Sequence, residues 1–169
     1  MNTIQIKLLP NNTKVPVRAN ATDAGMDVFA TEDILIKPMQ THILPLGFQM
    51  AIPEGYEATI RQRSGITSRT NLHIELGTID SPYRGEVGAI VRNISMVSAH
   101  EESIYTLDKA PDQEQRTAPH SYQILKGDKI AQIVISPIVT PSIQIVDELN
   151  ETSRGTNGFG STGTKGGIQ

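Results

Sequence analysis

Residues 77–87 have the sequence GTIDSPYRGEV, in which a carboxylate, an aromatic ring and several turn formers separate two apolar segments. Ile79 and the run 87–91 have the β-compatible character of two strands, and the Ser, Pro and Gly residues between them mark a reversal of the chain. The pattern predicts a β-hairpin with Asp80 and Tyr83 at its turn. Taken alone, it favours an ordinary turn in which the aspartate bonds a main-chain amide.

Short strand-like segments recur along the rest of the chain, separated by Pro and Gly residues. Helical periodicity is almost absent, which favours an all-β sandwich, jelly roll or barrel over a helical or βαβ fold. One short helix is expected after Arg63, with Ser64 as its N-cap. The strand-like segments are residues 3–8, 34–36, 56–61, 130–135 and 142–145.

Length and composition limit the classes of protein that fit. A chain of 169 residues suits one domain, and the lack of cysteine excludes disulfides, thiolate nucleophiles and cysteine-ligated zinc. A net charge of −3 gives no broad basic field, so duplex nucleic acid is not an expected partner, although a local basic pocket for a small anion is compatible. No apolar run approaches a bilayer span and no signal-peptide layout is seen, so we expect a cytoplasmic protein without membrane association.

Two segments differ in composition from the expected β domain of residues 1–149. Residues 95–121 form a polar, acidic insert with a net charge of −3, so the rest of the chain is neutral. A connection of this length within a compact domain is usually functional or flexible. Residues 150–169 are rich in Gly, Ser and Thr and are expected to form a flexible tail.

The tail also has the parts of a nucleotide-binding segment. Residues 154–163 have the sequence RGTNGFGSTG, which combines an arginine, an aromatic residue and hydroxyls with glycines. An arginine fork suits phosphate oxygens, glycines let main-chain amides approach an anion, and Phe159 can stack on a base. A glycine-rich segment is weak evidence by itself.

Three further segments place polar side chains near turns. Arg63-Ser64-Gly65 precedes the expected helix, whose N-terminus would present free amides to an anion. Residues 23–27 (DAGMD) place two carboxylates beside a glycine, which is more typical of an ordinary turn. In residues 127–132 (GDKIAQ), Asp128 is expected to be structural, and Gln132 is an amide within an apolar run that needs a polar partner.

In content and order, these five segments resemble the motifs of the homotrimeric dUTP pyrophosphatases, or dUTPases, over nearly the whole chain. The resemblance implies a distorted jelly-roll subunit and a homotrimer with active sites at subunit junctions, each closed by a neighbour's carboxy-terminal tail. Gln62, Met26 and the insert depart from the usual pattern, and the insert is similar to the extra segment of phage dUTPases from Gram-positive hosts. A bacterial or phage-infected host cell is therefore expected. The matching segments are residues 23–28, 63–66, 77–87, 127–132 and 154–163.

The resemblance implies hydrolysis of dUTP to dUMP and pyrophosphate by attack of a water on the α-phosphorus. Asp80 would orient and activate that water. Mg²⁺ is the implied cofactor, bound by the substrate's phosphates, while Asp27 and Gln132 hold metal-bound waters. The residues expected to bind the phosphate chain are Arg63, Ser64, Gly65, Gln132 and Arg154.

Selection of dUTP is implied by the same resemblance. Main-chain groups of Thr78, Ile79 and Gly88 would pair with uracil. A cytosine would leave some of these buried groups without a partner, and dCTP would therefore be rejected. Tyr83 against the sugar would leave no space for a ribose 2′-hydroxyl. The tail would act as a lid that orders on substrate, with Phe159 stacked over the uracil. The residues expected around the terminal phosphate are Gly160, Ser161 and Thr162.

Three other functions fit parts of the sequence. A dCTP deaminase is an enzyme alternative of the same fold, but Asp80 and Tyr83 together with a complete tail favour phosphate chemistry. A regulatory protein that binds a repressor through insert 95–121 is the alternative from another class, as an added activity. A purely structural jelly roll, such as a capsid or lectin subunit, leaves the five polar motifs unexplained.

Overall fold

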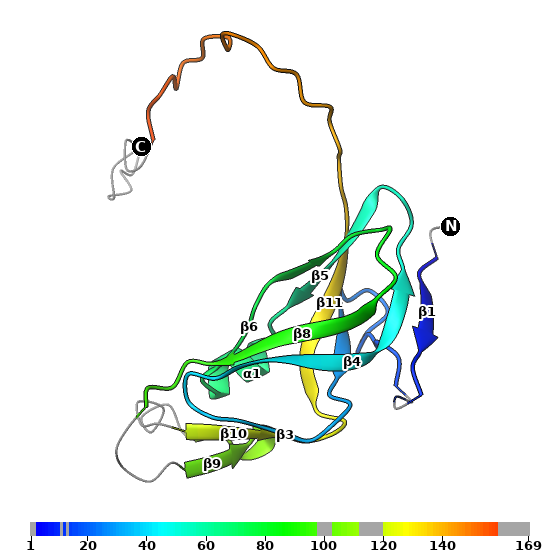
Figure 1. Ribbon diagram of the computed structural model, residues 1–169, viewed down its shortest axis with the longest axis vertical. Coiled ribbons are helices and arrows are strands. Elements are labelled where there is room, and N and C mark those ends of the chain that lie inside the picture. The colour runs from blue at the N-terminus through cyan, green and yellow to red at the C-terminus, as the bar shows by residue number, and fades with distance from the viewer. Residues whose placement is uncertain (1–2, 11, 13, 98–102, 112–119, 159–169) are drawn as a thin grey trace. The chain divides into compact units, whose positions relative to one another are not determined.

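The computed structural model describes residues 3–10, 12, 14–97, 103–111 and 120–158. Within these residues the regular secondary structure is almost entirely β-strand, with one short α-helix, as the sequence predicts (Figure 1). The chain divides into two compact units, Met1–Val139 and Thr140–Gln169, so residues 140–149 belong with the tail. No helix in the described part of the chain is long and apolar enough to cross a membrane.

The described strands of the first unit form three sheets. The first sheet has the strand order β1 (Gln5–Leu8), β4 (Thr41–Ala51), β8 (Glu86–Asn93) and β6 (Leu72–Ile74). The second has the order β2 (Gly25–Phe29), β11 (Lys129–Pro137), β5 (Tyr56–Arg61) and β7 (Gly77–Ile79). The smaller third sheet has the order β3 (Ile34–Ile36), β10 (His120–Ile124) and β9 (Ser103–Thr106). Helix α1 (Ser64–Arg69) follows β5.

The two larger sheets share one hydrophobic core. Side chains alternate along β8, where Val87, Ala89 and Val91 are buried and the residues between them are more exposed. The all-β jelly-roll prediction is confirmed by this architecture. Among the largest side chains in the core are Leu44, Leu46 and Phe48 of β4, Ile60 of β5, and Ile130 and Ile133 of β11.

Strands β7 and β8 do not pair with each other, so the predicted β-hairpin is wrong. The chain reverses where the Tyr83 amide donates to the Asp80 carbonyl at 3.1 Å. Strand β7 then pairs with β5, whereas β8 pairs with β4 and β6. The reason is that period-two alternation specifies which face of a strand is buried but not which strand lies beside it.

Two further predictions need correction. The strand predicted at 142–145 is absent, and Ile143 and Ile145 are each 95% exposed. Alternation yields a strand only where a neighbour supplies ladder hydrogen bonds, and no described strand pairs with this segment. The insert, in contrast, is more than a loop: β9 pairs in parallel with β10, and the 3-10 helix η1 (Leu107–Lys109) buries Leu107.

Candidate active site

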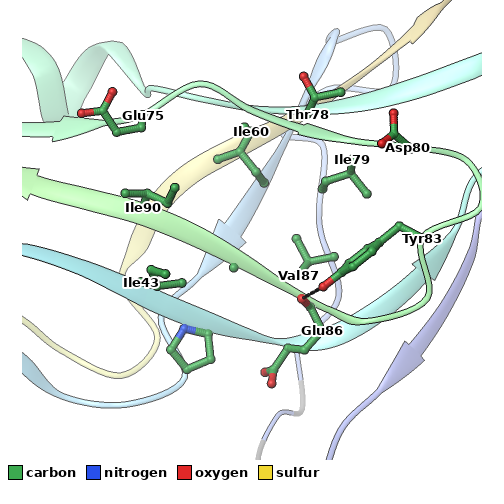
Figure 2. A pocket seen from close by; sticks show the side chains of 13 residues that line it. Ile43, Ile60, Glu75, Thr78, Ile79, Asp80, Tyr83, Glu86, Val87 and Ile90 are labelled. Carbon is green, nitrogen blue, oxygen red and sulfur yellow. Dashed lines mark hydrogen bonds between the residues drawn. The ribbon is translucent and has the colours of Figure 1, made fainter.

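The divergence of β7 and β8 opens a cavity of about 420 Å³ between them, which we call the fork cavity (Figure 2). Ile79 and Val87 point into the space between the strands, while Thr78 and Asp80 point to the other side of β7. The apolar walls would exclude water from a bound planar ring. The other apolar residues that line the fork cavity are Ile43, Pro45, Ile60 and Ile90.

Main-chain groups of both strands face the fork cavity without ladder partners. Strand β7 lies at the edge of its sheet, so its outer N–H and C=O groups have no partner strand among the described residues. Strand β8 pairs with β6 only from Val91 onward. The Ile90 carbonyl of β8 accepts from the Glu75 amide at 2.9 Å, which shows to which side of β8 the main-chain groups of Ile90 point. Main-chain groups alternate in direction along a strand, so those of Gly88, two residues away, point to the same side as those of Ile90. These donors and acceptors can recognise the polar edge of a heterocycle.

Tyr83 lies at the mouth of the fork cavity, and Gly85 allows its position. The Tyr83 hydroxyl donates to the Glu86 carbonyl at 3.0 Å, and the side chain remains 47% exposed. The ring folds back over the turn so closely that a Cβ atom at position 85 would lie 2.2 Å from the hydroxyl oxygen. The sequence pattern indicates only a turn former at Gly85, because no local pattern reveals this contact with the Tyr83 ring.

Asp80 is an exposed carboxylate at the rim of the fork cavity. Its main-chain carbonyl closes the turn with Tyr83. Its side chain makes no hydrogen bond or ion pair with the described residues, so both oxygens can accept hydrogen bonds from water. A carboxylate in this setting can orient a nucleophilic water.

A second cavity of about 430 Å³ lies at the start of α1, and we call it the anion cavity. The predicted helix is confirmed, but the predicted N-cap is wrong, because Arg63 and not Ser64 occupies that position. The Arg63 carbonyl accepts from the amides of Ile66 and Thr67 at 3.0 Å each, and no side chain caps the helix. The amides of Ser64 and Gly65 therefore have no intrahelical acceptor and are available to an anion.

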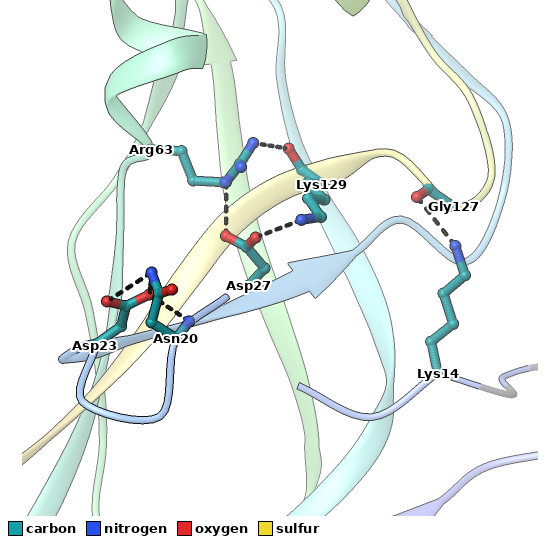
Figure 3. Close-up of polar contacts among 7 residues, drawn as sticks. All are labelled: Lys14, Asn20, Asp23, Asp27, Arg63, Gly127 and Lys129. Atoms are coloured by element: carbon teal, nitrogen blue, oxygen red, sulfur yellow. Dashed lines mark hydrogen bonds and ion pairs between the residues drawn. The ribbon is translucent and has the colours of Figure 1, made fainter. Parts of the chain in front are cut away.

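Asp27 joins two cations at the anion cavity (Figure 3). Its Oδ1 lies 2.8 Å from Arg63 Nε, and its Oδ2 lies 2.9 Å from Lys129 Nζ. Burial raises the pKa of Asp27, but the hydrogen bonds from Lys129 and Arg63 and their positive charges outweigh it, so the pKa lies below its ordinary value. Asp23 also lines the anion cavity, so the two cations are balanced by two carboxylates, and it is the Arg63 guanidinium beside the available amides of Ser64 and Gly65 that suits a phosphate.

Sequence reasoning missed Lys129, because its ion pair forms only once β11 lies beside β2. Asp23 and Asp128 behave as the ordinary turn interpretation predicts. Asp23 accepts from the Asn20 amide at 2.8 Å, and Asp128 accepts from the Leu125 amide at 2.9 Å (Figure 3 shows the first of these).

Gln132 has the polar partner that its sequence context requires. It lies opposite Asp27 in the β2–β11 pairing, and its Nε2 donates to the Gln62 carbonyl at 2.8 Å. A Cβ atom at Gly25 would lie 2.2 Å from Gln132 Oε1, so a glycine is needed for this amide to lie across the strand. Both Gly25 and Gln132 line the anion cavity.

The anion cavity fits a divalent cation only in combination with a bound polyphosphate. The described residues contain no group of three or more His, Cys, Asp or Glu side chains that could hold a metal ion. Both oxygens of Asp27 already face cations, which favours contact with a metal through water. Mg²⁺ suits this arrangement because it retains several waters and takes phosphate oxygens as direct ligands.

The structure sorts the predicted site residues into two groups, and no described residue lines both cavities. Arg154 belongs to the second unit, where it is exposed and its Nε donates to the Asn157 carbonyl at 3.0 Å. The fork cavity contains Thr78, Ile79, Asp80, Tyr83 and Gly88, and the anion cavity contains Asp27, Arg63, Ser64, Gly65 and Gln132. Outside the described residues lie Phe159, Gly160, Ser161 and Thr162.

Known proteins resemble the chain over almost its full length. The dUTPase family model matches residues 11–100 and 118–163, and the unmatched stretch between them lies within the acidic insert. The deoxyuridine 5'-triphosphate nucleotidohydrolase of Clostridium tetani is 40% identical over 163 residues, which cover 95% of this chain and 97% of the relative. That of Paramecium bursaria Chlorella virus 1 is 33% identical over 163 residues, with coverage of 96% and 99%.

Solved structures of phage enzymes agree with this chain in fold. The dUTPase of Staphylococcus bacteriophage 80alpha with dUpNHpp has a TM-score of 0.86 and 36% identity, and the match covers 97% of this chain and 100% of that one. The dUTPase from phage phi11 of S. aureus, solved to visualise its species-specific insert, has a TM-score of 0.79 and 34% identity, with coverage of 89% and 100%.

Proposed function

This chain belongs to the dUTPase family and is a dUTP diphosphatase, and we propose which of its residues hydrolyse dUTP to dUMP and pyrophosphate. The observation that carries the proposal is the fork cavity, whose rim bears the exposed carboxylate of Asp80 beside Tyr83. The resemblance to phage enzymes further supports a phage-type member of the family. We place the activity in the cytoplasm of a bacterial or phage-infected cell, where its nucleotide substrate is found.

Asp80 is the residue proposed to act on water. Its oxygens are not engaged by the described residues, so they can accept a hydrogen bond from a water and direct its lone pair to the α-phosphorus. The water's proton passes to this carboxylate as the new P–O bond forms and the bond to the pyrophosphate breaks. General base catalysis of this kind contributes about 10²- to 10⁴-fold.

The residues of the anion cavity are proposed to bind the triphosphate. Arg63 offers its guanidinium, Ser64 a hydroxyl and an amide, and Gly65 an amide, and together they offset negative charge on the phosphates. Mg²⁺, when bound, would neutralise charge that develops on the leaving pyrophosphate. Asp27 and Gln132 would orient waters around the ion. Their positions in the anion cavity support this assignment.

Selection of uracil is proposed to reside in the main chain of the fork. The outer edge of β7 and the free groups of Gly88 would pair with the uracil edge, and a cytosine would leave buried groups unpaired. Tyr83, held by its hydrogen bond to the Glu86 carbonyl, would lie against the deoxyribose where a 2′-hydroxyl cannot fit.

A complete site is proposed to form only in a homotrimer. The fork cavity and the anion cavity have no described residue in common, so one chain supplies two partial sites. The anion cavity of one subunit would face the fork cavity of a second, and the tail of a third would cover both. Arg154 would then contact the phosphates, with Phe159 over the base and residues 160–162 around the terminal phosphate.

Proton release in the presence of Mg²⁺ tests the reaction and its selectivity together. The purified chain is assayed with the four common deoxynucleoside triphosphates, dUTP and UTP, and pyrophosphate and ammonia are measured in parallel. Pyrophosphate release from dUTP alone is expected. Ammonia release from dCTP would instead indicate a deaminase. The similar proteins of Clostridium tetani and Paramecium bursaria Chlorella virus 1 are nucleotidohydrolases, which favours pyrophosphate release.

A second, regulatory function is proposed for the acidic insert. The family model omits part of it, and Ile104 on the outer strand β9 is 62% exposed. We propose that this surface binds a repressor protein. Because Leu107 is buried, deletion of residues 99–117 would also disturb the core, and Ile104→Ser is the milder test. Each variant is expected to lose repressor binding while it retains dUTP hydrolysis. If both variants still bind the repressor, the insert is not the binding surface.

A further inference from the structure

Gln62 lies between the end of β5 and the start of α1 and joins three elements. Its Nε2 lies 2.7 Å from Nε2 of His73 in β6. Its Oε1 accepts a hydrogen bond from the Thr67 hydroxyl of α1 at 2.6 Å. Its main-chain carbonyl accepts from Gln132 of β11 at 2.8 Å. One half-buried residue therefore links the helix to strands of both large sheets.

These bonds restrain the first turn of α1 without using its amides. A Ser or Asp at the N-cap would accept from one of the first amides of the helix. Here Arg63 is the N-cap and makes no side-chain capping bond. The Thr67 hydroxyl instead contacts both Gln62 Oε1 and the Arg63 carbonyl, the latter at 3.2 Å, and so ties the turn to the residue before it. The amides of Ser64 and Gly65 stay available to an anion.

Gln62 also connects this turn to the two cavities. Its carbonyl holds the Nε2 of Gln132, which lines the anion cavity. On the other side, His73 Nδ1 lies 3.7 Å from Oε1 of Glu75, which lines the fork cavity. A shift of Gln62 would therefore change the position of Arg63 relative to Gln132.

We propose that Gln62 is a positioning residue for Arg63, Ser64 and Gly65, acting through its side-chain bond to the Thr67 hydroxyl and touching no substrate itself. The inference rests on the proposed function, in which the turn at 63–65 binds the phosphates. A misplacement of about 1 Å in a reacting geometry costs roughly 10²-fold in rate, so a small displacement of this turn affects catalysis before it affects folding.

The test compares Gln62→Met, Thr67→Val and the double variant with the wild type as full-length chains. Methionine keeps the length of the side chain and the main-chain carbonyl but removes both side-chain hydrogen bonds. For Gln62→Met, kcat with dUTP should fall roughly 10- to 100-fold, with a smaller change in KM. The preference for dUTP over dCTP should not change, because Gln62 makes no hydrogen bond to the main chain of β7 or of Gly88, where the base is proposed to pair. The double variant should lose less than the two single losses combined, since both changes break the bond between Gln62 Oε1 and the Thr67 hydroxyl.

Gln40→Met is the matched control, because Gln40 Oε1 accepts from the Lys37 amide at 3.0 Å and lines neither cavity. It should keep wild-type kinetics. A wild-type kcat in Gln62→Met would overturn the inference. A purely structural role would also overturn it. In that case the melting temperature would fall, and the loss of kcat would equal the loss of sites that a non-hydrolysable dUTP analogue can titrate. A wild type that does not hydrolyse dUTP would refute the proposed function and this inference with it.

Discussion

Replacing Gly85 by alanine should impair sugar selectivity without disturbing the fold. The added Cβ would lie 2.2 Å from the Tyr83 hydroxyl oxygen, 2.5 Å from Cζ and 2.9 Å from Cε2, whereas ordinary contact begins at 3.4 Å. The ring must therefore move by roughly 1 Å, which breaks its hydrogen bond to the Glu86 carbonyl. That bond is worth about 0.5–1.5 kcal/mol, and the ring is already half exposed, so the free energy of unfolding should fall by about 1 kcal/mol or less.

The assay measures kcat/KM for dUTP and for UTP with wild type and Gly85→Ala. A pocket contact typically contributes about 1–3 kcal/mol to discrimination, so the preference for dUTP should fall by roughly 10- to 200-fold. Urea unfolding, monitored by circular dichroism, measures the change in stability. Tyr83→Ala removes the ring and sets the maximum loss of selectivity.

The double variant Tyr83→Ala/Gly85→Ala separates the ring from the main chain. If Gly85 acts only by making room for the ring, the double variant should match Tyr83→Ala. A wild-type preference for dUTP in Gly85→Ala would show that the position of the Tyr83 ring does not set sugar selectivity. A double variant that is less selective than Tyr83→Ala would show that the turn itself is distorted.

Three further predictions concern Asp80, Asp27 and the tail. Asp80→Asn should bind dUTP normally by calorimetry but lose on the order of 10² or more in kcat, and near-normal turnover would remove Asp80 from its role. Because the pKa of Asp27 is lowered in the folded state, its carboxylate stabilises the fold above about pH 3.9 and this contribution is lost as the pH falls through the lower folded value. In Asp27→Asn, the free energy of unfolding should therefore fall less steeply than in the wild type as the pH is lowered below about pH 4. An equally steep fall in both proteins would contradict the ion pairs of Asp27. Truncation before Arg154 should greatly reduce turnover while the melting temperature stays the same, since no described residue of the tail belongs to the core; full activity would exclude a lid.

The local elements and the chemistry they carry can be predicted from the order of residues along the chain. Strand 56–61 and helix 64–69 follow from alternation and from the turn residues beside them, which act over a few residues. The five polar motifs identified the family without any coordinates, because their residue types and order are properties of the chain.

Which segments lie side by side depends on the packing of the folded chain. Strands β7 and β8 are adjacent in sequence, yet they enter different sheets, and their separation creates the fork cavity. The contacts of Asp27 with Lys129, and of Gln62 with His73 and Gln132, likewise join segments that are distant along the chain. A period of two tells which side chains face the core, but the choice of partner strand and register depends on the packing of the whole molecule.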